Sequence, residues 1–310
     1  PVDGQDWSSD PWTAAERNGR LYGRGACDMK GFIAVALAYA PRFLERDLAL
    51  PIHLCLSYDE EVGCQGVPRL LEFLAAQPVR PIACIVGEPT DMKVVTGHKG
   101  KLSYRCRVRG LECHSSLLPK GVNAVEAAAR VVARLSDMAA RKAQDGPFDH
   151  DYDVPYSTVH CGVIQGGTAL NIVPALCRFE FELRYLPGED PRALLAEIQA
   201  YAHEALEPAM KAVAPETGFA WEELWSHPGL DIPADAEVVA LAKSLAGANA
   251  TGKVAFGTEA GLFHESGIPA VVCGPGSIEQ AHKPDEFITV EQLALCERFM
   301  TRLLDRVSKP

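Results

Sequence analysis

The sequence contains no uncharged apolar run approaching the roughly 20 residues that a membrane-spanning helix requires. It also lacks the basic-then-apolar opening of a secretory signal peptide. Lysine and arginine together number 30, against 41 aspartate and glutamate residues, which gives a formal net charge of -11. Nucleic acids and anionic membranes favour proteins with excess cationic side chains, so neither is expected as the main partner. These features predict a soluble, cytoplasmic protein.

The ten cysteines include no C-x-x-C pair, which argues against a zinc knuckle or a dithiol redox motif. Several lie inside apolar runs, so we expect reduced cysteines that serve in packing. The chain also has no tandem repeat and no low-complexity segment. Its 310 residues, 47% of them hydrophobic, suit a globular protein of about two domains.

Helical and strand-like patterns alternate at both ends of the chain, which predicts a parallel sheet covered by helices. The helix and strand patterns span residues 31–46, 51–58, 66–77 and 81–87 at the beginning, and 235–246, 253–256, 259–265, 269–273 and 290–307 at the end. We therefore predict one α/β domain, residues 1–97 with 228–310, built on a doubly wound, mostly parallel sheet.

The middle of the chain, residues 98–227, follows a different pattern. Strands and helices there are expected in the order βαββαβ, which predicts an inserted ferredoxin-like α+β domain. Residues 101–109 alternate strictly, with a row of cationic side chains on one face. That row could contact nucleic acid, but a later strand, 178–185, offers alternating Glu180 and Glu182. We favour pairing of charges across the two strands.

The adjacent carboxylates Glu60 and Glu61 follow the apolar run 51–58, which predicts a buried strand. Ligands in open α/β sheets bind beyond the carboxyl ends of the strands, so this is a candidate active-site position. Successive side chains of an extended segment point in opposite directions, and the two carboxylates are therefore expected to have separate roles. A solvated acidic turn is the alternative for an isolated pair.

Three further residues occupy strand ends or glycine-rich turns: Asp28, Glu88 and His282. Taken singly, they are also consistent with a helix N-cap, a turn carboxylate and a solvated histidine. Together with Glu61 they form an oxygen-rich donor set with one imidazole, which suits two divalent ions such as Zn, Co or Mn. Such ions lower the pKa of a bridging water toward ~7, and Glu60 is then free to transfer its proton.

This set resembles the M20 family, the aminoacylases and deacetylases with two metal ions. Asp28 resembles the family's bridging aspartate, Glu60 and Glu61 its Glu-Glu pair, and Glu88 the ligand of its Gly-Glu-Pro loop. The resemblance implies that Asp28 and Glu88 hold a first ion, while Asp28, Glu61 and His282 hold a second. It further implies that Glu60 is the catalytic base and that a non-proline cis peptide follows Asp28.

Within this family, residues 256–261 and 274–286 most resemble enzymes of arginine biosynthesis that hydrolyse N-acetylornithine to ornithine and acetate. The resemblance makes Glu259 a candidate partner for the substrate's side-chain ammonium. A carboxylate that stabilises a helix start is an equally good interpretation of Glu259. The other candidate substrate-binding residues are Asn171, Arg184 and Thr258.

The inserted domain carries two more stretches that look like the family pattern, residues 112–116 and 166–174. The resemblance implies that His114 reaches the active site of a second subunit and stabilises the tetrahedral oxyanion there. A polar loop residue is the alternative interpretation of His114. The inserted domain is accordingly expected to act as a lid through which two chains form a homodimer.

The family's first ion has one more ligand, a histidine in a His-x-Asp motif, which this chain lacks. We therefore expect the chain to be a fragment. A protein limited to these residues is expected to bind one ion well and the other poorly, and to hydrolyse its substrate slowly or not at all. Two alternatives remain open. One is a related hydrolase, such as succinyl-diaminopimelate desuccinylase or an aminoacylase, or an enzyme that acts on N-acetylcitrulline. The other is a homologue without catalytic activity.

Overall fold

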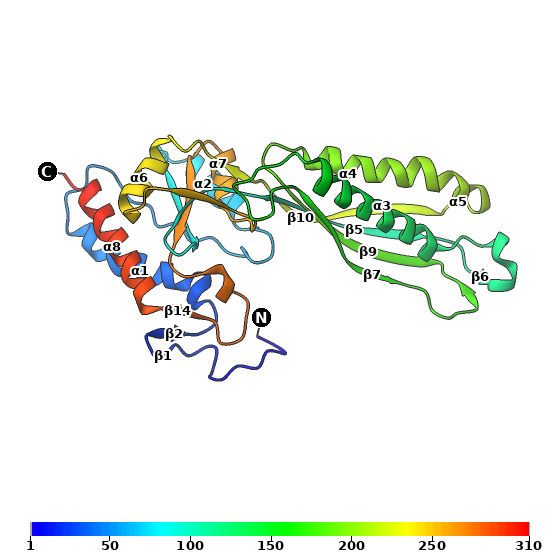
Figure 1. Cartoon of the computed structure of the whole chain (residues 1–310), viewed down its shortest axis with the longest axis horizontal. Coiled ribbons are helices and arrows are strands. Elements are labelled where there is room, and N and C mark those ends of the chain that lie inside the picture. Colours follow the sequence, from blue (N-terminus) through cyan, green and yellow to red (C-terminus); the bar gives the residue numbers. More distant parts are fainter. Residues whose placement is uncertain (1, 310) are drawn as a thin grey trace. The chain divides into compact units, whose positions relative to one another are not determined.

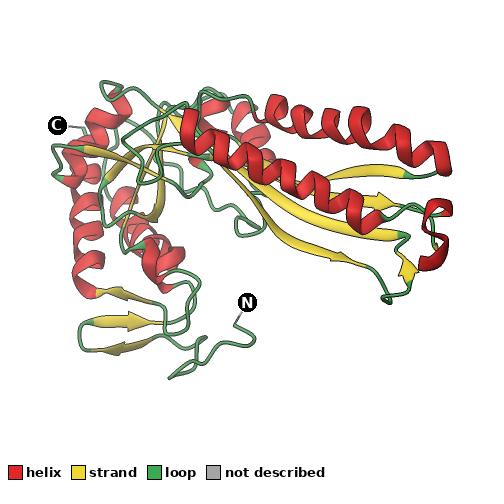
Figure 2. Cartoon of the chain, turned by 45° about the vertical axis from the view of Figure 1, so that its right-hand side comes forward, coloured by secondary structure: helices red, strands yellow, loops and turns green. Residues whose placement is uncertain are grey.

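A computed structural model describes residues 2–309 of the chain, which forms a mixed α/β fold (Figures 1 and 2). The chain divides into two compact units. The first comprises the residues up to His98 together with those from Leu230 onward, and the second is Lys99–Gly229. Among the described residues, no helix has the length and apolar character needed to cross a membrane.

The main sheet of the first unit is mixed, so the prediction of a mostly parallel sheet is confirmed only in part. Its strand order is β11-β4-β13-β3, and β12 also pairs with β4. The pairs β13–β3 and β12–β4 are parallel, whereas β4 runs antiparallel to both β13 and β11. These strands are β3 (Cys84–Pro89), β4 (Val94–His98), β11 (Leu230–Asp231), β12 (Thr251–Val254) and β13 (Ala270–Gly274).

The direction of β4 follows from the short connection that precedes it. Only residues 90–93 separate β3 from β4, and two of them, Asp91 and Met92, adopt left-handed φ values of 55° and 58°. A connection between parallel strands needs about a dozen residues or more to cross the sheet. A turn this short reverses the chain, and β4 therefore enters the sheet antiparallel.

Helices cover this sheet on both faces, as predicted. On β13, Val271 and Cys273 belong to one buried cluster, while Ala270 and Val272 belong to another. This split follows from the alternation of side chains along a strand. The first cluster contains residues of α1 (Gly31–Leu44), α6 (Glu237–Ala246) and α8 (Val290–Val307), and the second contains residues of α2 (Val67–Ala75) and α7 (Ala260–Glu265). All five helices form close to the predicted ranges.

The predicted buried strand over residues 51–58 does not form. The segment is irregular, and Leu54, Leu56 and Tyr58 are exposed by 42%, 60% and 50%. A strand is stable only when a neighbour pairs with its backbone groups. Within the described chain, no strand runs beside residues 51–57, and no backbone–backbone hydrogen bond involves them. Apolar character alone was therefore not sufficient to predict the strand.

A small three-stranded sheet, absent from the predictions, brings two distant parts of the sequence together. It consists of β1 (Ala15–Arg17), β2 (Arg20–Tyr22) and β14 (Phe287–Thr289), with β2 antiparallel to both neighbours. The turn that carries Asp28 follows β2, and the segment that carries His282 precedes β14. Pairing of β2 with β14 therefore places these two segments close to each other.

The second unit contains an antiparallel sheet with the strand order β10-β5-β9-β7 (Figure 1). Its helices lie on one face of that sheet (Figure 2). The predicted pairing of charges across strands is confirmed, since Lys101 Nζ lies 2.9 Å from Glu182 and Arg105 Nε 2.8 Å from Glu180. The elements are β5 (Gly100–Arg109), β6 (Cys113–His114), α3 (Ala124–Asp145), β7 (Thr158–Gly166), β8 (Ile172–Val173), β9 (Leu176–Tyr185), α4 (Pro191–Ala200), α5 (Glu207–Val213) and β10 (Gly218–His227).

All ten cysteines are unpaired, as expected for reduced thiols. Six are buried and serve in packing: Cys27, Cys64, Cys106, Cys177, Cys273 and Cys296. Cys55 is exposed, because it lies in the irregular segment that was expected to be a buried strand.

Candidate metal centre

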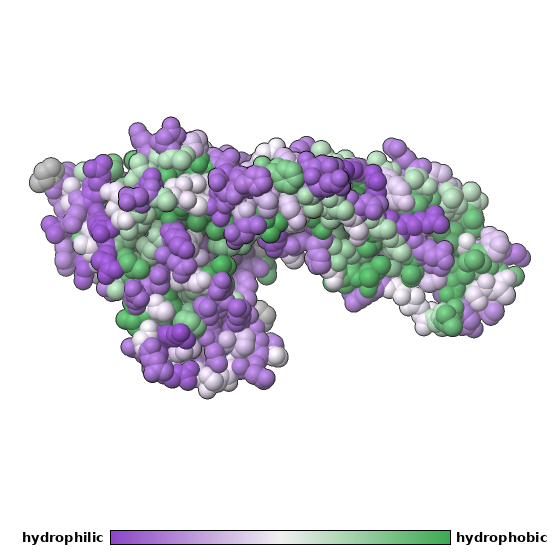
Figure 3. Space-filling model, in the orientation of Figure 1, coloured by the Kyte–Doolittle hydropathy of each residue, from purple (hydrophilic) through white to green (hydrophobic). Residues whose placement is uncertain are grey.

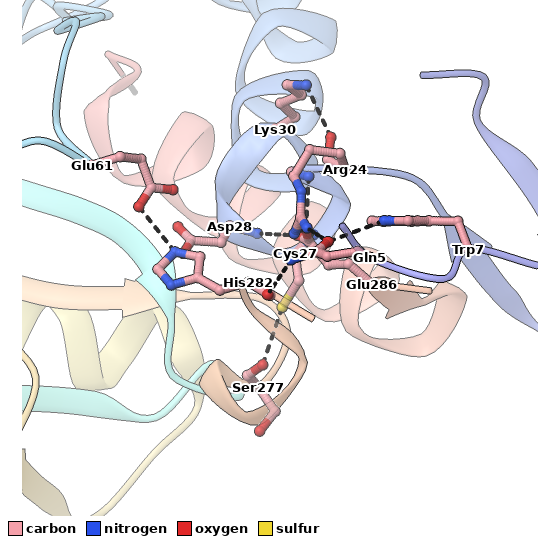
Figure 4. A network of polar contacts seen from close by, with 11 residues as sticks. Gln5, Trp7, Arg24, Cys27, Asp28, Lys30, Glu61, Ser277, His282 and Glu286 are labelled. Carbon is pink, nitrogen blue, oxygen red and sulfur yellow. Dashed lines mark hydrogen bonds and ion pairs between the residues drawn. The ribbon is translucent and has the colours of Figure 1, made fainter. Parts of the chain in front are cut away.

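Three predicted ligands from distant parts of the chain meet in the first unit. One donor atom from each of Asp28, Glu61 and His282 lies within 4.8 Å of the other two. His282 Nε2 is 2.9 Å from Glu61 Oε2 and 3.2 Å from Asp28 Oδ2, and Figure 4 shows the imidazole between the two carboxylates. The Asp28 side chain is 12% exposed, whereas those of Glu61 and His282 are exposed by 57% and 66%. The cluster thus opens to solvent on one side.

Irregular backbone presents two of these three residues. Asp28 lies in the turn Ala26–Lys30 before α1, where its φ and ψ are -117° and 92°. The peptide bond between Asp28 and Met29 is cis, which confirms the prediction for this position. His282 adopts a left-handed φ of 62°, a conformation that costs free energy in a residue other than glycine. Non-glycine residues with a left-handed φ cluster at functional sites, where the surrounding structure holds them in place.

Glu88, near the end of β3, is not among the three residues whose donor atoms meet, but it is a neighbour of Asp28. Its side chain is buried and forms a hydrogen bond with Asp28. Burial, and then the negative charge of Asp28, raise the pKa of Glu88 well above its ordinary value. The preceding Gly87 is needed for packing, since a Cβ there would lie 2.1 Å from the Phe32 ring of α1. This close contact gives a physical reason for the glycine in the Gly-Glu-Pro loop.

The neighbouring carboxylates Glu60 and Glu61 contact different residues. Glu61 contacts His282, while Glu60 accepts a hydrogen bond from the Cys64 thiol at 3.6 Å. Burial, and then the charges of Glu61 and Asp28, raise the pKa of Glu60 to about 7. A carboxyl group with this pKa can accept and release a proton near neutral pH.

Two of the four candidate substrate-binding residues lie in the same unit. Glu259, immediately before α7, accepts a hydrogen bond from Ser57 Oγ at 2.6 Å, and burial raises its pKa. Its charge also contributes to the raised pKa of Glu60. Thr258 is fully buried, and its hydroxyl accepts a hydrogen bond from the backbone N–H of Ala260. The Thr258 hydroxyl therefore serves the backbone at the start of α7, whereas the charge of Glu259 acts on the carboxylates of the candidate site.

The other two substrate-binding candidates, Asn171 and Arg184, belong to the second unit, as does His114, the candidate for stabilising the oxyanion. There the short strands β6 and β8 pair, with His114 opposite Ile172, and the Asn171 carbonyl accepts a hydrogen bond from the Ser115 N–H. The two stretches expected to belong to the lid pattern thus lie side by side. Nδ1 of His114 is 2.8 Å from Ser116 Oγ, and Arg184 Nε donates to Glu182 at 2.9 Å.

Sequence reasoning missed Glu286, which contacts the turn that carries Asp28. Its carboxylate accepts hydrogen bonds from the N–H groups of Gly25, Cys27 and Asp28 and from the Arg24 guanidinium. The residue follows His282 by only four positions, but a single glutamate in a polar loop gives no distinguishing signal.

The chemistry of this donor set fits divalent cations. Burial raises the pKa values of Glu60, Glu61, Glu88 and Glu259, and the negative charge of Asp28 raises those of Glu60, Glu61 and Glu88 further. Bringing several carboxylates together is unfavourable unless positive charge compensates them. Carboxylate oxygens with one imidazole nitrogen suit Zn, Co or Mn. Asp28, Glu61 and His282 are also the set that the family resemblance assigns to the second ion.

We expect the stability of the metal-free protein to fall as the pH rises from about 4.5 to about 7. The pKa of Glu60 is about 7 in the folded state, compared with 4.5 ordinarily, so the folded state holds an extra proton in this window. Stability decreases with pH wherever the folded state binds more protons than the unfolded state. Melting temperatures measured with a chelator across this range should decline less steeply for Glu60→Gln. Identical slopes for the two proteins would contradict the prediction.

Residues 1–306 match Peptidase family M20/M25/M40. The chain is 39% identical to acetylornithine deacetylase of Myxococcus xanthus, with 94% of this chain and 74% of the relative covered. It is 36% identical to acetylornithine deacetylase of Proteus mirabilis, with 98% and 76% covered.

A solved structure shares the fold at lower sequence identity. An M20 family metallo-carboxypeptidase from Sulfolobus solfataricus superimposes with a TM-score of 0.72 at 19% identity, with 98% of this chain and 82% of that chain covered. This likeness concerns the fold alone. The family match and the two more similar relatives carry the assignment, and the chain belongs to the M20/M25/M40 peptidase family.

Proposed function

We propose that this protein is a metal-dependent amide hydrolase that removes the acetyl group from N-acetylornithine. The observation that carries the proposal is the convergence of Asp28, Glu61 and His282 within 4.8 Å, beside a carboxyl group, Glu60, whose pKa lies near neutrality. Asp28, Glu61 and His282 are proposed to hold one divalent ion, Zn or Co. Asp28 and Glu88 are proposed as ligands of a second ion.

The ions, when bound, lower the pKa of a bound water and polarise the amide carbonyl. Glu60 is left to move the proton, since it contacts Cys64 rather than His282. In its ionised form Glu60 accepts a proton from the attacking water, and it then delivers that proton to the leaving amine nitrogen. Burial of Glu60 favours its neutral form and nearby positive charge favours its ionised form, and a general acid–base residue must reach both.

The choice of N-acetylornithine rests on the relatives and on one side chain. Both relatives described above are named acetylornithine deacetylase, and they share 39% and 36% of aligned residues with this chain. Ornithine carries a side-chain ammonium that needs an anionic partner. Glu259 is proposed for that role, since it is partly buried and its charge acts on both Glu60 and Glu88.

Paired substrates test the proposal in the natural full-length protein supplied with Zn or Co. We expect N-acetylornithine to be hydrolysed with a kcat/KM at least about 100-fold above that for N-succinyl-diaminopimelate, because the latter brings two additional carboxylates toward acidic side chains, and like charges in contact cost several kcal/mol. N-acetylcitrulline, which is neutral at the side-chain end, serves as the control for Glu259. Preference for the succinyl substrate would instead support a desuccinylase, and no hydrolysis of any amide would support a non-catalytic homologue.

We further propose that residues 99–229 form the ferredoxin-like lid and mediate a homodimer. Their βαββαβ order and one-sided helix cover support the first part. The proposed homodimer is supported by the edge strand β7, which has a free side, and by four exposed leucines: Leu117, Leu118, Leu170 and Leu176. Figure 3 shows hydrophobic surface at the end of this unit where β6 lies. Sedimentation equilibrium that finds only monomers would contradict the homodimer. In such a dimer, His114, Asn171 and Arg184 are proposed to contact substrate.

A further inference from the structure

Glu286 is a buried acid that the proposed chemistry does not use. Its side chain is 1% exposed, and burying an ionised carboxylate is costly unless hydrogen bonds compensate the charge. Four donors provide that compensation. Oε1 accepts from the N–H groups of Cys27 at 2.9 Å and Asp28 at 3.0 Å, and Oε2 accepts from Gly25 N–H and from Arg24 Nη1, both at 2.8 Å.

Three of the four donors are backbone N–H groups of residues 25–28, in and immediately before the turn that presents Asp28. Successive N–H groups that converge on one anion form a concave site that fixes the backbone around it. Because Asp28 itself donates to Glu286, the bond acts directly on the residue whose side chain enters the metal cluster. Hydrogen bonds to an ionised acceptor are also stronger than neutral ones.

A second set of contacts ties the same carboxylate to His282. Gln5 Nε2 donates to the His282 carbonyl at 3.1 Å, and its Oε1 accepts from Arg24, which also binds Glu286 (Figure 4). The Arg24 guanidinium lies over the Trp7 ring, 5.0 Å from its centroid. Since Glu286 and His282 are four residues apart on one segment, these contacts close a ring that lies beside the cluster and includes the backbone of His282.

We propose that Glu286 is a positioning residue for the metal centre and sets the separation between Asp28 and His282. This inference rests on the proposed function, because it assumes that Asp28 and His282 are ligands. A carboxylate is required at this position. All four groups facing it are donors, and a glutamine would turn its own NH₂ donors toward one pair of them.

The test is the substitution Glu286→Gln in the natural full-length protein, with Glu291→Gln as the matched control. Glu291 lies in the first turn of α8, is exposed, and is not part of the ring of contacts around Glu286. Two quantities are measured: amide hydrogen exchange of Gly25, Cys27 and Asp28 in metal-free protein, and the affinity for Co²⁺ by titration of its visible absorption.

We expect Glu286→Gln to accelerate exchange of these three amides at least about tenfold, because each loses part of its acceptor. The affinity for Co²⁺ should fall by about 10- to 100-fold, the usual effect of removing a group that orients a metal ligand. The Co²⁺ spectrum should also change, which a role in stability alone would not cause. Glu291→Gln should match the wild type within about twofold in both measurements.

Unchanged exchange together with unchanged Co²⁺ affinity would overturn the inference. If the wild type binds no Co²⁺, the proposed function fails, whereas the exchange measurement still decides whether Glu286 holds the Asp28 turn. If circular dichroism shows that Glu286→Gln does not fold, Arg24→Met removes one of the four donors instead. That variant should show smaller changes in the same direction, and normal Co²⁺ affinity in it would count against the ring of contacts.

Discussion

Replacing Glu60 with glutamine is expected to lower kcat by about 10²- to 10⁴-fold while the protein keeps its metal ions, because general acid–base catalysis contributes rate factors of this size. Glutamine has nearly the same shape as glutamate but cannot take up a proton at neutral pH. The measurement is kcat for N-acetylornithine together with metal content per chain. Metal content should not change, since Glu60 contacts Cys64 and not the cluster of Asp28, Glu61 and His282.

Glu72→Gln is the matched control for this experiment. Glu72 lies on α2, is exposed, and undergoes the same loss of one negative charge. Its kcat should equal that of the wild type. Loss of bound metal in Glu60→Gln would instead identify Glu60 as a ligand, and the assignment of proton transfer to this residue would then be wrong.

Replacing Asp28 with alanine is expected to abolish both tight metal binding and activity. Asp28 is the one carboxylate that neighbours proposed ligands of both ions. It lies 3.2 Å from His282 and forms a hydrogen bond with Glu88. Its loss removes a ligand from each proposed ion. The affinity for Zn²⁺ should fall by at least about 10²-fold, because even indirect support of a metal ligand is worth 10- to 100-fold.

The matched control is Asp47→Ala, an exposed aspartate that pairs with Lys309 on the same unit. It should bind metal and turn over like the wild type. Treating the wild type with a chelator should reproduce the inactivity of Asp28→Ala, and added Zn²⁺ or Co²⁺ should restore activity only in the wild type. Activity that survives both the chelator and the substitution would contradict a metal-dependent mechanism.

Much of the fold could be predicted from the sequence, because helices and strands produce apolar patterns among residues that are near one another in the chain. The helices around residues 31–44 and 290–307 carry long apolar patterns, and they form within a few residues of the predicted bounds. The antiparallel neighbours β5 and β9 were indicated by two rows of alternating charge. Pairing across the main sheet was less predictable. The turn before β4 reverses the chain, and the apolar run 51–58 lacks a neighbouring strand among the described residues.

The sequence by itself determined which side chains are available for chemistry: Asp28, the pair Glu60 and Glu61, Glu88 and His282, in a pattern that identifies the family. Only the tertiary structure decided how these side chains lie relative to one another. The pairing of β2 with β14 brings Asp28 to His282, and Glu286 contacts the Asp28 turn across 258 positions of sequence. Contacts between residues so far apart in sequence depend on three-dimensional packing. The local patterns of apolar and polar residues do not predict them.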